Sequence, residues 1–250
     1  MLVPSWDISI KGDFLYQSVR FVEDEKLNNL ETIKQVVQEE LSCSAHHMDH
    51  VMRVYRLSLH LAKDIPDVDL DILRPAVLLH DIARVKEDRD TSGTIDHAVL
   101  GAEMAENILE DLHYSQEDIS NIKHCIRTHR FRSKKEPKSI EAKLLFDADK
   151  VDVLGAVGIA RSFMIAGQYG EQMYTDVNIN DYVKDNLVGG QKTGRIKDIS
   201  KHTPNLEFET KFKKIPEKLH TKKAKTMARE RLKFMRLFFH RLKREINGAV

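Results

Sequence analysis

The sequence contains little cysteine, few aromatic residues and no long apolar run. Its 250 residues include two cysteines, Cys43 and Cys125. These are too few for a disulfide framework in a chain of this length, so we expect a reducing, cytoplasmic location. No run of about 18 uncharged apolar residues occurs, so the sequence predicts no membrane-spanning helix. The segment before Asp13 has an early acidic residue and no apolar stretch of the kind found in signal peptides.

The net charge of the whole chain is small, but two parts of the chain carry large net charges of opposite sign. The 40 lysines and arginines and the 39 aspartates and glutamates leave a formal net charge of +1, which disfavours a histone-like or strongly acidic protein. Residues 191–250 carry 18 basic and 6 acidic residues, a net charge of +12, so residues 1–190 carry −11. This basic segment is either a solvated face or a phosphate-attracting wall. Its lysines have no interleaved aromatics beyond Phe208 and Phe212, so we expect no nucleic-acid partner.

Glycine and proline are sparse between residues 25 and 166, where apolar residues recur at steps of three and four. This periodicity, with little sustained alternation, predicts an all-α fold. We expect an N-terminal segment with a helix (1–41), a helical core (42–166), a polar, lid-like excursion (167–205) and a basic C-terminal helical segment packed on the core (206–250). The glycines from Gly189 to Gly194 lack the spacing of a phosphate-binding loop at a helix start, so a flexible polar loop is expected there.

Local start and stop signals divide the chain into helices. Serine and aspartate residues suited to capping open them, and Pro66 follows the first as a stop signal. The expected helices run from Ser42 or Ser44 to about Lys63, over Leu70–Arg84, from His97 to about Leu112, from Ser115 to about His129, over Ser139–Ala166 and over Thr221–Asn247, with a charged loop from Lys86 to Gly93. The helix after Ser139 is apolar on nearly every side, which predicts that it is buried and that its carboxylates have partners.

Histidine is abundant, and nine of the twelve histidines lie before residue 130. Several of them, with aspartates, fall on different predicted helices, on or at the end of an apolar stripe: His50, the pair His80 and Asp81, His97, His129 and Asp149. A helix bundle can gather such groups in its interior. Imidazole with carboxylate suits Mn, Fe, Co, Ni or Zn, and carboxylate with water also admits Mg. Hydrolysis by metal-activated water is therefore the first hypothesis. Other histidines are expected at the surface or behind the site: His46, His47, His60, His113 and His124.

This ordered set resembles the HD-domain metal-dependent phosphohydrolases. The matching stretches are His50-Val-Met-Arg-Val, Ala-Val-Leu-Leu-His80-Asp81-Ile, His97-Ala-Val-Leu-Gly-Ala, Ile126-Arg-Thr-His129 and Phe-Asp147-Ala-Asp149-Lys-Val-Asp152. Gly155 to Arg161 and the stretch from Thr221 look like the subgroup of small bacterial and archaeal HD hydrolases. The resemblance covers residues 42–166 well and 206–247 loosely. It implies an all-α HD-domain helical bundle.

The resemblance also implies two alternative ligand sets. One holds a single ion on His50, His80, Asp81 and Asp149. The other adds a second ion on His97 and His129, with Asp81 as the bridge. In both, Asp81, His97 and His129 act in catalysis, and His97 and His129 contact substrate phosphate if only one ion is present. Both alternatives fit the sequence.

Asp147 and Asp149 compete for the last ligand position. A step of two residues turns a helix by about 200°, so only one of them can face the site. We choose Asp149, because it precedes a basic residue as the family's ligand does. Asp152 shares the face of Asp149 and is expected to support the ligands from behind.

The sequence therefore predicts a phosphohydrolase that uses one or two divalent ions to cleave a phosphoester or phosphoanhydride bond, in a nucleotide or related small phosphate. Arg53, Lys150 and Arg161 are expected to bind substrate or steady the ligands. The sequence departs from the subgroup at Lys150, where arginine is usual, and in its long excursion. These departures bear on the substrate more than on metal binding. Two alternatives are a dinuclear iron oxygenase with the same six ligands and a non-catalytic, metal-stabilised binding module. We expect no membrane partner, and the oligomeric state is open.

Overall fold

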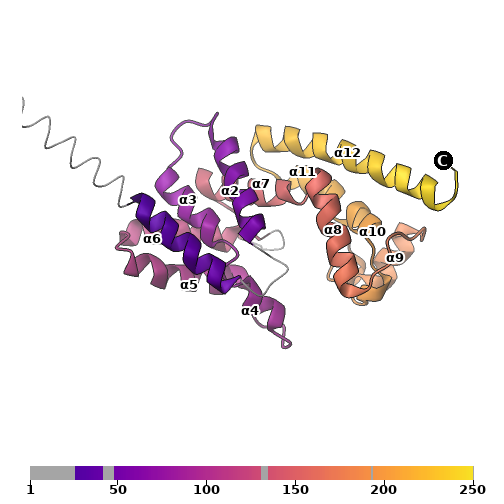
Figure 1. Ribbon diagram of the computed structural model, residues 1–250, viewed down its shortest axis with the longest axis horizontal. Coiled ribbons are helices and arrows are strands. Elements are labelled where there is room, and N and C mark those ends of the chain that lie inside the picture. The colour runs from indigo at the N-terminus through magenta and orange to yellow at the C-terminus, as the bar shows by residue number, and fades with distance from the viewer. Residues whose placement is uncertain (1–25, 42–47, 131–134, 193, 250) are drawn as a thin grey trace, which may run out of the picture.

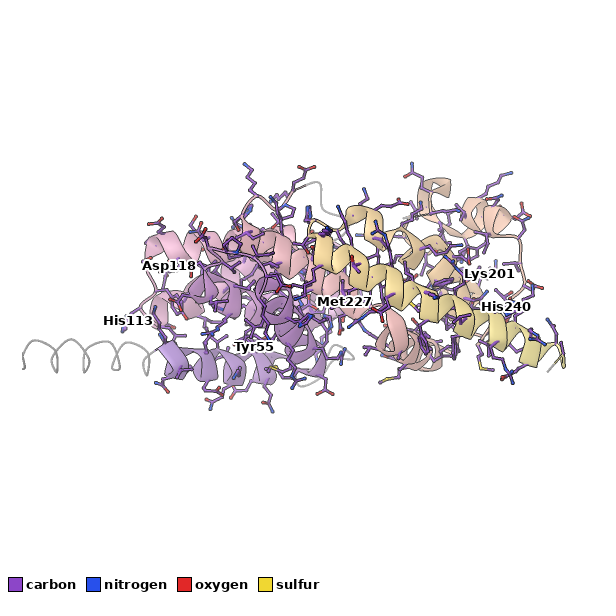
Figure 2. The ribbon with its side chains drawn as sticks, turned by 90° about the horizontal axis from the view of Figure 1, so that it is seen from above. Tyr55, His113, Asp118, Lys201, Met227 and His240 are labelled. Atoms are coloured by element: carbon purple, nitrogen blue, oxygen red, sulfur yellow. The ribbon has the colours of Figure 1, made fainter. Side chains whose placement is uncertain are left out.

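The computed structural model describes residues 26–41, 48–130, 135–192 and 194–249. Helices form the regular structure of these residues, and no strand occurs among them. The all-α prediction is thus confirmed. Figure 1 shows two groups of helices side by side, with the last long helix running across from one to the other. Figure 2 gives the same elongated outline from above, with His113 and Asp118 at one end and Lys201 and His240 at the other.

The first group of helices forms the core around the site. Residues 26–40 are helical. They are followed by α2 (Met48–Ala62), α3 (Leu70–Leu79), α4 (Arg84–Arg89), α5 (His97–Asp111), α6 (Gln116–Thr128) and α7 (Ile140–Asp152). Ten of the thirteen α7 residues are buried, as the apolar pattern around its three aspartates predicts. The central position of α7 brings its carboxylates into the core.

The second group consists of α8 (Gly155–Tyr169), α9 (Ile179–Asn186), α10 (Pro204–Thr210), α11 (Ile215–Lys218) and α12 (Lys222–Ile246), with three short 3₁₀ turns between them. The excursion over residues 167–205 contains α9, which packs a small second apolar core of Tyr182, Val183, Leu187 and Leu206. Apolar residues of α12, among them Met235 and Phe239, join the main core instead. The C-terminal helix therefore braces both groups.

Most predicted helix starts are confirmed. The side chains of Asp69, Asp96, Ser115, Ser139 and Thr221 each accept a hydrogen bond from a backbone N–H in the first turn of the following helix. These signals lie within a few residues of the helix they start, which is why they can be read locally. The proposed caps Ser42 and Ser44 lie outside the described residues.

The predicted helix over Leu70–Arg84 is wrong in its last third. The helix ends at Leu79, residues 80–83 form turns, and α4 then occupies part of the segment expected to be a charged loop. Backbone bonds tighten to three-residue steps here, from Ile82 N–H to the Leu79 carbonyl at 3.1 Å and from Arg84 N–H to the Asp81 carbonyl at 2.8 Å. In a continuous helix, neighbouring side chains diverge by about 100°. The break allows His80 and Asp81, adjacent in sequence, to face the same site.

The single long helix predicted over Ser139–Ala166 is also wrong, because α7 and α8 are separate and bent by 65° at their junction. Gly155 opens α8 with φ +77°, a conformation that side chains with a Cβ rarely adopt. A Cβ at this position would also lie 3.1 Å from the Arg231 side chain. Among the described residues no single helix is long and apolar enough to cross a bilayer, and only α7 and α8 taken together reach that length and composition.

Candidate metal centre

Six side chains from separate elements meet inside the first group of helices. His50 comes from α2, His97 from the first position of α5, and Asp149 from α7. His80 and Asp81 lie in the turn after α3, and His129 directly follows α6. Each of the six is at most 8% exposed. The structure therefore brings together every residue of both predicted ligand sets.

Asp81 lies at the centre of this cluster. Its Oδ2 is 3.7 Å from the Nε2 atoms of His50 and His80, and its Oδ1 is 3.5 Å from those of His97 and His129. Donor atoms around an ion with bonds of about 2.1 Å lie roughly 3.0–3.5 Å apart, close to this spacing. Each oxygen of Asp81 thus faces one pair of histidines, which divides the cluster into two adjoining groups.

The four histidines are oriented by hydrogen bonds on their outer nitrogens. The Nδ1 atoms lie 2.8 Å from Asp152 Oδ2 for His50, 2.7 Å from the Val77 carbonyl for His80, 2.7 Å from Glu87 Oε2 for His97 and 2.6 Å from the Ile126 carbonyl for His129. Carbonyl and carboxylate oxygens only accept, so each Nδ1 carries the proton and donates. The lone pair of each neutral ring is then on Nε2, directed into the cluster. This is the arrangement that metal-binding histidines require.

Two further observations fit a bound divalent cation. His80 Nε2 is buried and has no hydrogen-bond partner among the described residues. His97 Nε2 and His129 Nε2 lie 3.2 Å apart. With both Nδ1 atoms donating, two lone pairs face each other at this distance unless one ring takes up a second proton or a metal ion lies between them. The donor set, imidazole nitrogen with carboxylate oxygen, suits a divalent transition metal.

The electrostatics keep most of these groups in their ligand forms. Burial lowers the pKa of His80 to about 4, so this ring is neutral near pH 7. Burial opposes ionisation of Asp81, but the histidines around it hold its pKa well below the usual range. Lys150, His50 and His80 do the same for the buried carboxyl of Asp149. His50 differs: against the effect of burial, Asp149 and Asp152 raise its pKa to about 9. A metal ion at its Nε2 must therefore displace a proton.

Asp147 and Asp149 face opposite sides of α7. Asp149 Oδ1 is 3.4 Å from His50 Nε2. Asp147 instead accepts hydrogen bonds from the backbone N–H groups of His220 and Thr221 at 2.8 and 2.7 Å, and from the Thr221 hydroxyl at 2.7 Å. The helical arc used in the sequence argument explains this separation. Asp147 thereby fixes the start of α12 against α7.

The residues predicted to bind substrate take different positions. Arg53 is absent from the lining of the two cavities beside the cluster. Its guanidinium donates to both oxygens of Asp152, at 2.9 and 3.0 Å, and so steadies the partner of His50. Lys150 forms an ion pair with Asp149. Lys150 and Arg161 both line the cavity over the cluster. His60 and His113 are exposed, while His46 and His47 lie outside the described residues. His124 is half-buried and accepts from the Lys138 N–H at 3.0 Å.

A cavity of about 430 Å³ opens over the cluster. It is lined by six cationic side chains from well-separated parts of the sequence: Arg84, Arg130, Lys150, Arg161, Arg195 and Lys211. Arg195 and Lys211 belong to the basic segment, so part of that segment lines the cavity over the cluster. Other members face elsewhere, as Lys223 pairs with Asp64 at 2.7 Å.

Glu87 was missed by the sequence reasoning, which placed it in a loop. On α4 its carboxylate accepts from His97 Nδ1 at 2.7 Å, from Arg84 at 2.9 Å and from Arg130 at 3.0 Å. Burial opposes its ionisation, but His97 and the two arginines lower the pKa of Glu87 to about 2. One carboxylate thus connects a predicted ligand with two cations of the cavity wall. The three-residue step from Arg84 to Glu87 is the helical signal that could have revealed it.

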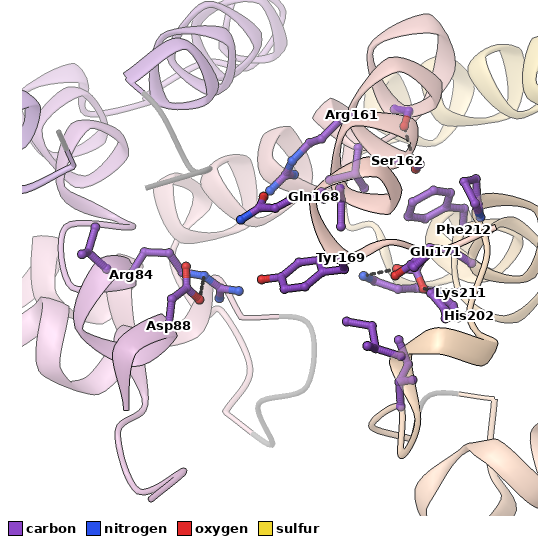
Figure 3. A pocket seen from close by; sticks show the side chains of 18 of the residues that line it. Arg84, Asp88, Arg161, Ser162, Gln168, Tyr169, Glu171, His202, Lys211 and Phe212 are labelled. Atoms are coloured by element: carbon purple, nitrogen blue, oxygen red, sulfur yellow. Dashed lines mark hydrogen bonds and ion pairs between the residues drawn. The ribbon is translucent and has the colours of Figure 1, made fainter. Parts of the chain in front are cut away.

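A second cavity, of about 530 Å³, continues the first toward the second group of helices (Figure 3). Both cavities are lined by Arg84, Asp88, Val153, Arg161 and Lys211. Together they form one cleft. The candidate ligands lie at one end, and most of the apolar lining residues lie at the other, together with further charged ones.

Comparison with known proteins identifies relatives of this chain. The HD domain model matches residues 48–154. The chain is 30% identical to YpgQ of Bacillus subtilis over 229 residues, 89% of this chain and 96% of that protein. The crystal structure of Bacillus subtilis YpgQ in complex with ADP has a TM-score of 0.65 at 27% identity, covering 90% of this chain and 98% of that one. An HD-superfamily hydrolase from Bacillus thuringiensis has a TM-score of 0.64 at 26% identity, covering 89% and 98%. The 3′-5′ exoribonuclease YhaM of Bacillus subtilis is 28% identical over 147 residues, but these are 53% of this chain and 46% of YhaM.

Proposed function

The chain belongs to the HD-domain superfamily of hydrolases, and from this premise we propose that it is a divalent-metal-dependent phosphohydrolase. Its reaction is the cleavage of a phosphoester or phosphoanhydride bond in a nucleotide. The observation that carries the proposal is the set of four buried histidines whose Nδ1 atoms all donate outward and whose Nε2 atoms all face Asp81. Such a set needs a cation.

Two adjoining groups of ligands are assigned. His50, His80, Asp81 and Asp149 would hold one ion, and Asp81, His97 and His129 would hold a second. Bound divalent ions supply Lewis acidity, which lowers the pKa of water and polarises a phosphoryl oxygen. Asp152 and Glu87 orient His50 and His97 through their Nδ1 protons, which keeps both Nε2 lone pairs available.

Cationic side chains of the protein bind the phosphates of the substrate. Arg84 and Arg130 are held by Glu87 at the mouth of the cluster, and Arg161 and Lys211 extend the positive lining along the cleft. Phosphoryl transfer requires positioning and neutralisation of charge more than covalent chemistry. These side chains bind the phosphates on either side of the bond that breaks.

The shape of the cleft favours a nucleotide over a smaller phosphate. A phosphate at the cluster occupies only the 430 Å³ cavity, whereas the 530 Å³ extension has room for a nucleoside. Tyr169 and Phe212 give that extension aromatic surface. The related Bacillus subtilis YpgQ has been crystallised with ADP, which supports the same substrate class here.

The test is a substrate screen of the purified chain loaded separately with Mn²⁺, Co²⁺, Zn²⁺ or Mg²⁺. We expect phosphate or pyrophosphate release from nucleotides, little from p-nitrophenyl phosphate, and loss of turnover with chelator. Oxygen consumption by a coupled-iron form would instead support the oxygenase. Full metal occupancy without turnover on any phosphate would support the binding module, and trimming of RNA alone would support the YhaM-like activity.

A further inference from the structure

The part of the cleft beyond the metal ligands has a lining that hydrolysis itself does not require. None of the six proposed ligands lines the larger cavity. Its apolar lining includes Val85, Val153, Ile165, Ile196, Ile199 and Phe212. Arg84, Arg161 and Lys211 stand between this apolar end and the cluster, because they line both cavities. A molecule with its phosphates at the cluster therefore directs its organic part into this end.

Tyr169 presents an aromatic face inside the cavity. It is the last residue of α8, lines the cavity, and is 54% exposed. Figure 3 shows its ring lying across the cavity, with Arg84 and Asp88 on one side and Glu171 and Lys211 on the other. No ring partner of Tyr169 occurs among the described residues. A flat heteroaromatic group is the natural occupant of such a surface.

Glu171 lies two residues beyond Tyr169 and is held in place by the end of the helix. Gly170 takes the left-handed conformation with φ +67°, and the Glu171 N–H donates to the Ala166 carbonyl at 2.8 Å. This is the hydrogen-bonded C-terminus that glycine permits. The backbone thus fixes Tyr169 and Glu171 relative to each other at one wall of the cavity.

The carboxylate of Glu171 has no hydrogen-bond donor among the described residues, and the basic group that acts on it electrostatically is His202. The nearby Lys211 is 2.6 Å from Glu207, which also lies 3.1 Å from His202. His202 in turn contacts the Tyr182 hydroxyl through Nδ1 at 2.6 Å. These neighbours satisfy one another. Burial and the nearby carboxylate of Glu207 raise the pKa of Glu171, against the opposing effect of His202.

We propose that this end of the cleft is a nucleobase subsite selective for guanine, in which Tyr169 stacks on the base and Glu171 accepts hydrogen bonds from its N1–H and 2-amino group. This rests on the proposed nucleotide substrate. Guanine presents two adjacent donors on one edge, which match the two oxygens of an ionised carboxylate. Adenine and cytosine set one donor beside a ring-nitrogen acceptor. Uracil sets one donor between two carbonyl oxygens, which the carboxylate repels.

The test is binding of GDP, IDP and ADP to the Mn²⁺-loaded chain by calorimetry. IDP keeps N1–H but lacks the 2-amino group. We expect GDP to bind about 10- to 100-fold more tightly than ADP, with IDP between them, because hydrogen bonds to charged groups carry discrimination of this size. Glu171→Gln offers one acceptor and one donor, so it should lose the preference for GDP and gain relative affinity for ADP. The matched control is Glu209→Gln on α10, which pairs with Lys213 and does not line this cavity.

Stacking is tested separately from base selection. Tyr169→Ala should weaken all three diphosphates by about 5- to 100-fold, and Tyr169→Phe should bind like the native chain, because only the ring is required. Equal affinity for the three diphosphates, or a GDP preference that survives Glu171→Gln, would overturn the guanine subsite even if nucleotides are hydrolysed. A GDP preference without hydrolysis of GTP, GDP or GMP would leave the subsite standing and refute the phosphohydrolase instead.

Discussion

Glu87 provides a sharp test of how the cluster is assembled, because it contacts only one of the two groups of ligands. Its carboxylate accepts from His97, Arg84 and Arg130 at 2.7, 2.9 and 3.0 Å, and its side chain is 16% exposed. In Glu87→Gln a single amide oxygen remains to accept from His97, Arg84 and Arg130, and the amide NH₂ group faces one of these donors. The ring of His97 then loses its fixed orientation or competes with an arginine for the remaining oxygen.

The expected cost follows from this geometry. Loss of an outer hydrogen-bond partner of a metal-binding histidine weakens metal affinity by about 10- to 100-fold. For Glu87→Gln that loss should fall on the ion held by Asp81, His97 and His129, and affinity at the His50 side should stay within about twofold. Calorimetric titration with Mn²⁺ measures both affinities in one experiment. Glu103→Gln, an exposed change on the same helix as His97, is the matched control.

The reasoning would be refuted by equal weakening of both ions, or by two unchanged affinities. Binding of only one Mn²⁺ to the native chain would also refute it, since the 3.2 Å separation of His97 Nε2 and His129 Nε2 was assigned to a cation between them. The variant should also raise the KM for a nucleotide, because Arg84 and Arg130 lose the carboxylate that holds them beside the cluster.

Three further changes test the supporting structure. Asp147→Asn should destabilise the fold by about 2–4 kcal/mol in urea titrations, because Asp147 is buried and accepts three hydrogen bonds at the start of α12. The metal content of this variant should not change. Loss of metal with normal stability would make Asp147 the ligand in place of Asp149. His202 and Lys211 hold the pKa of Glu207 well below its ordinary value despite burial, so its contribution to stability is present above about pH 4.5 and is lost as the pH falls further. Glu207→Gln should therefore flatten the decline in stability between pH 5 and pH 3, and an unchanged acid profile would contradict this account. Gly155→Ala should lower the free energy of unfolding by about 1–3 kcal/mol, because Gly155 has a positive φ. Gly167→Ala should be neutral or stabilising, because a Cβ at this position of α8 meets nothing within 4 Å. Equal effects of the two substitutions on thermal unfolding would contradict this prediction.

Local features of the fold could be predicted from the sequence because their causes are local. Ser115 and Asp96 cap the helices they immediately precede, and the apolar pattern around Asp149 requires a buried helix. The two failures have a common origin. Neither the turn after Leu79 nor the bend before Gly155 interrupts the apolar periodicity, so a continuous helix satisfied the pattern. Gly155 also lies close to Arg231 of α12, a contact between distant parts of the chain that no local signal contains.

The candidate ligands could be predicted as a set because each lies on or at the end of an apolar stripe that must face the core. Of the cations that line the cavity, Lys150 and Arg161 were predicted, but Arg84, Arg130, Arg195 and Lys211 were not. Arg195 lies in the excursion and Lys211 follows it. Neither has a periodic signal that ties it to the cluster, yet both line the same cavity as Arg130. Arg53 was expected either to bind substrate or to steady the ligands. Its two hydrogen bonds to Asp152 fit the second of these roles, because they direct it behind the ligands. Long-range packing decides which charges reach the cavity.

The central claim is that the four histidines and two aspartates hold two divalent ions at one end of a nucleotide-binding cleft. The most direct measurement is an anomalous difference map from crystals grown with Mn²⁺. The account predicts two peaks, one among His50, His80, Asp81 and Asp149 and the other among Asp81, His97 and His129. An empty cluster at saturating Mn²⁺, or ions bound only elsewhere on the chain, would contradict it.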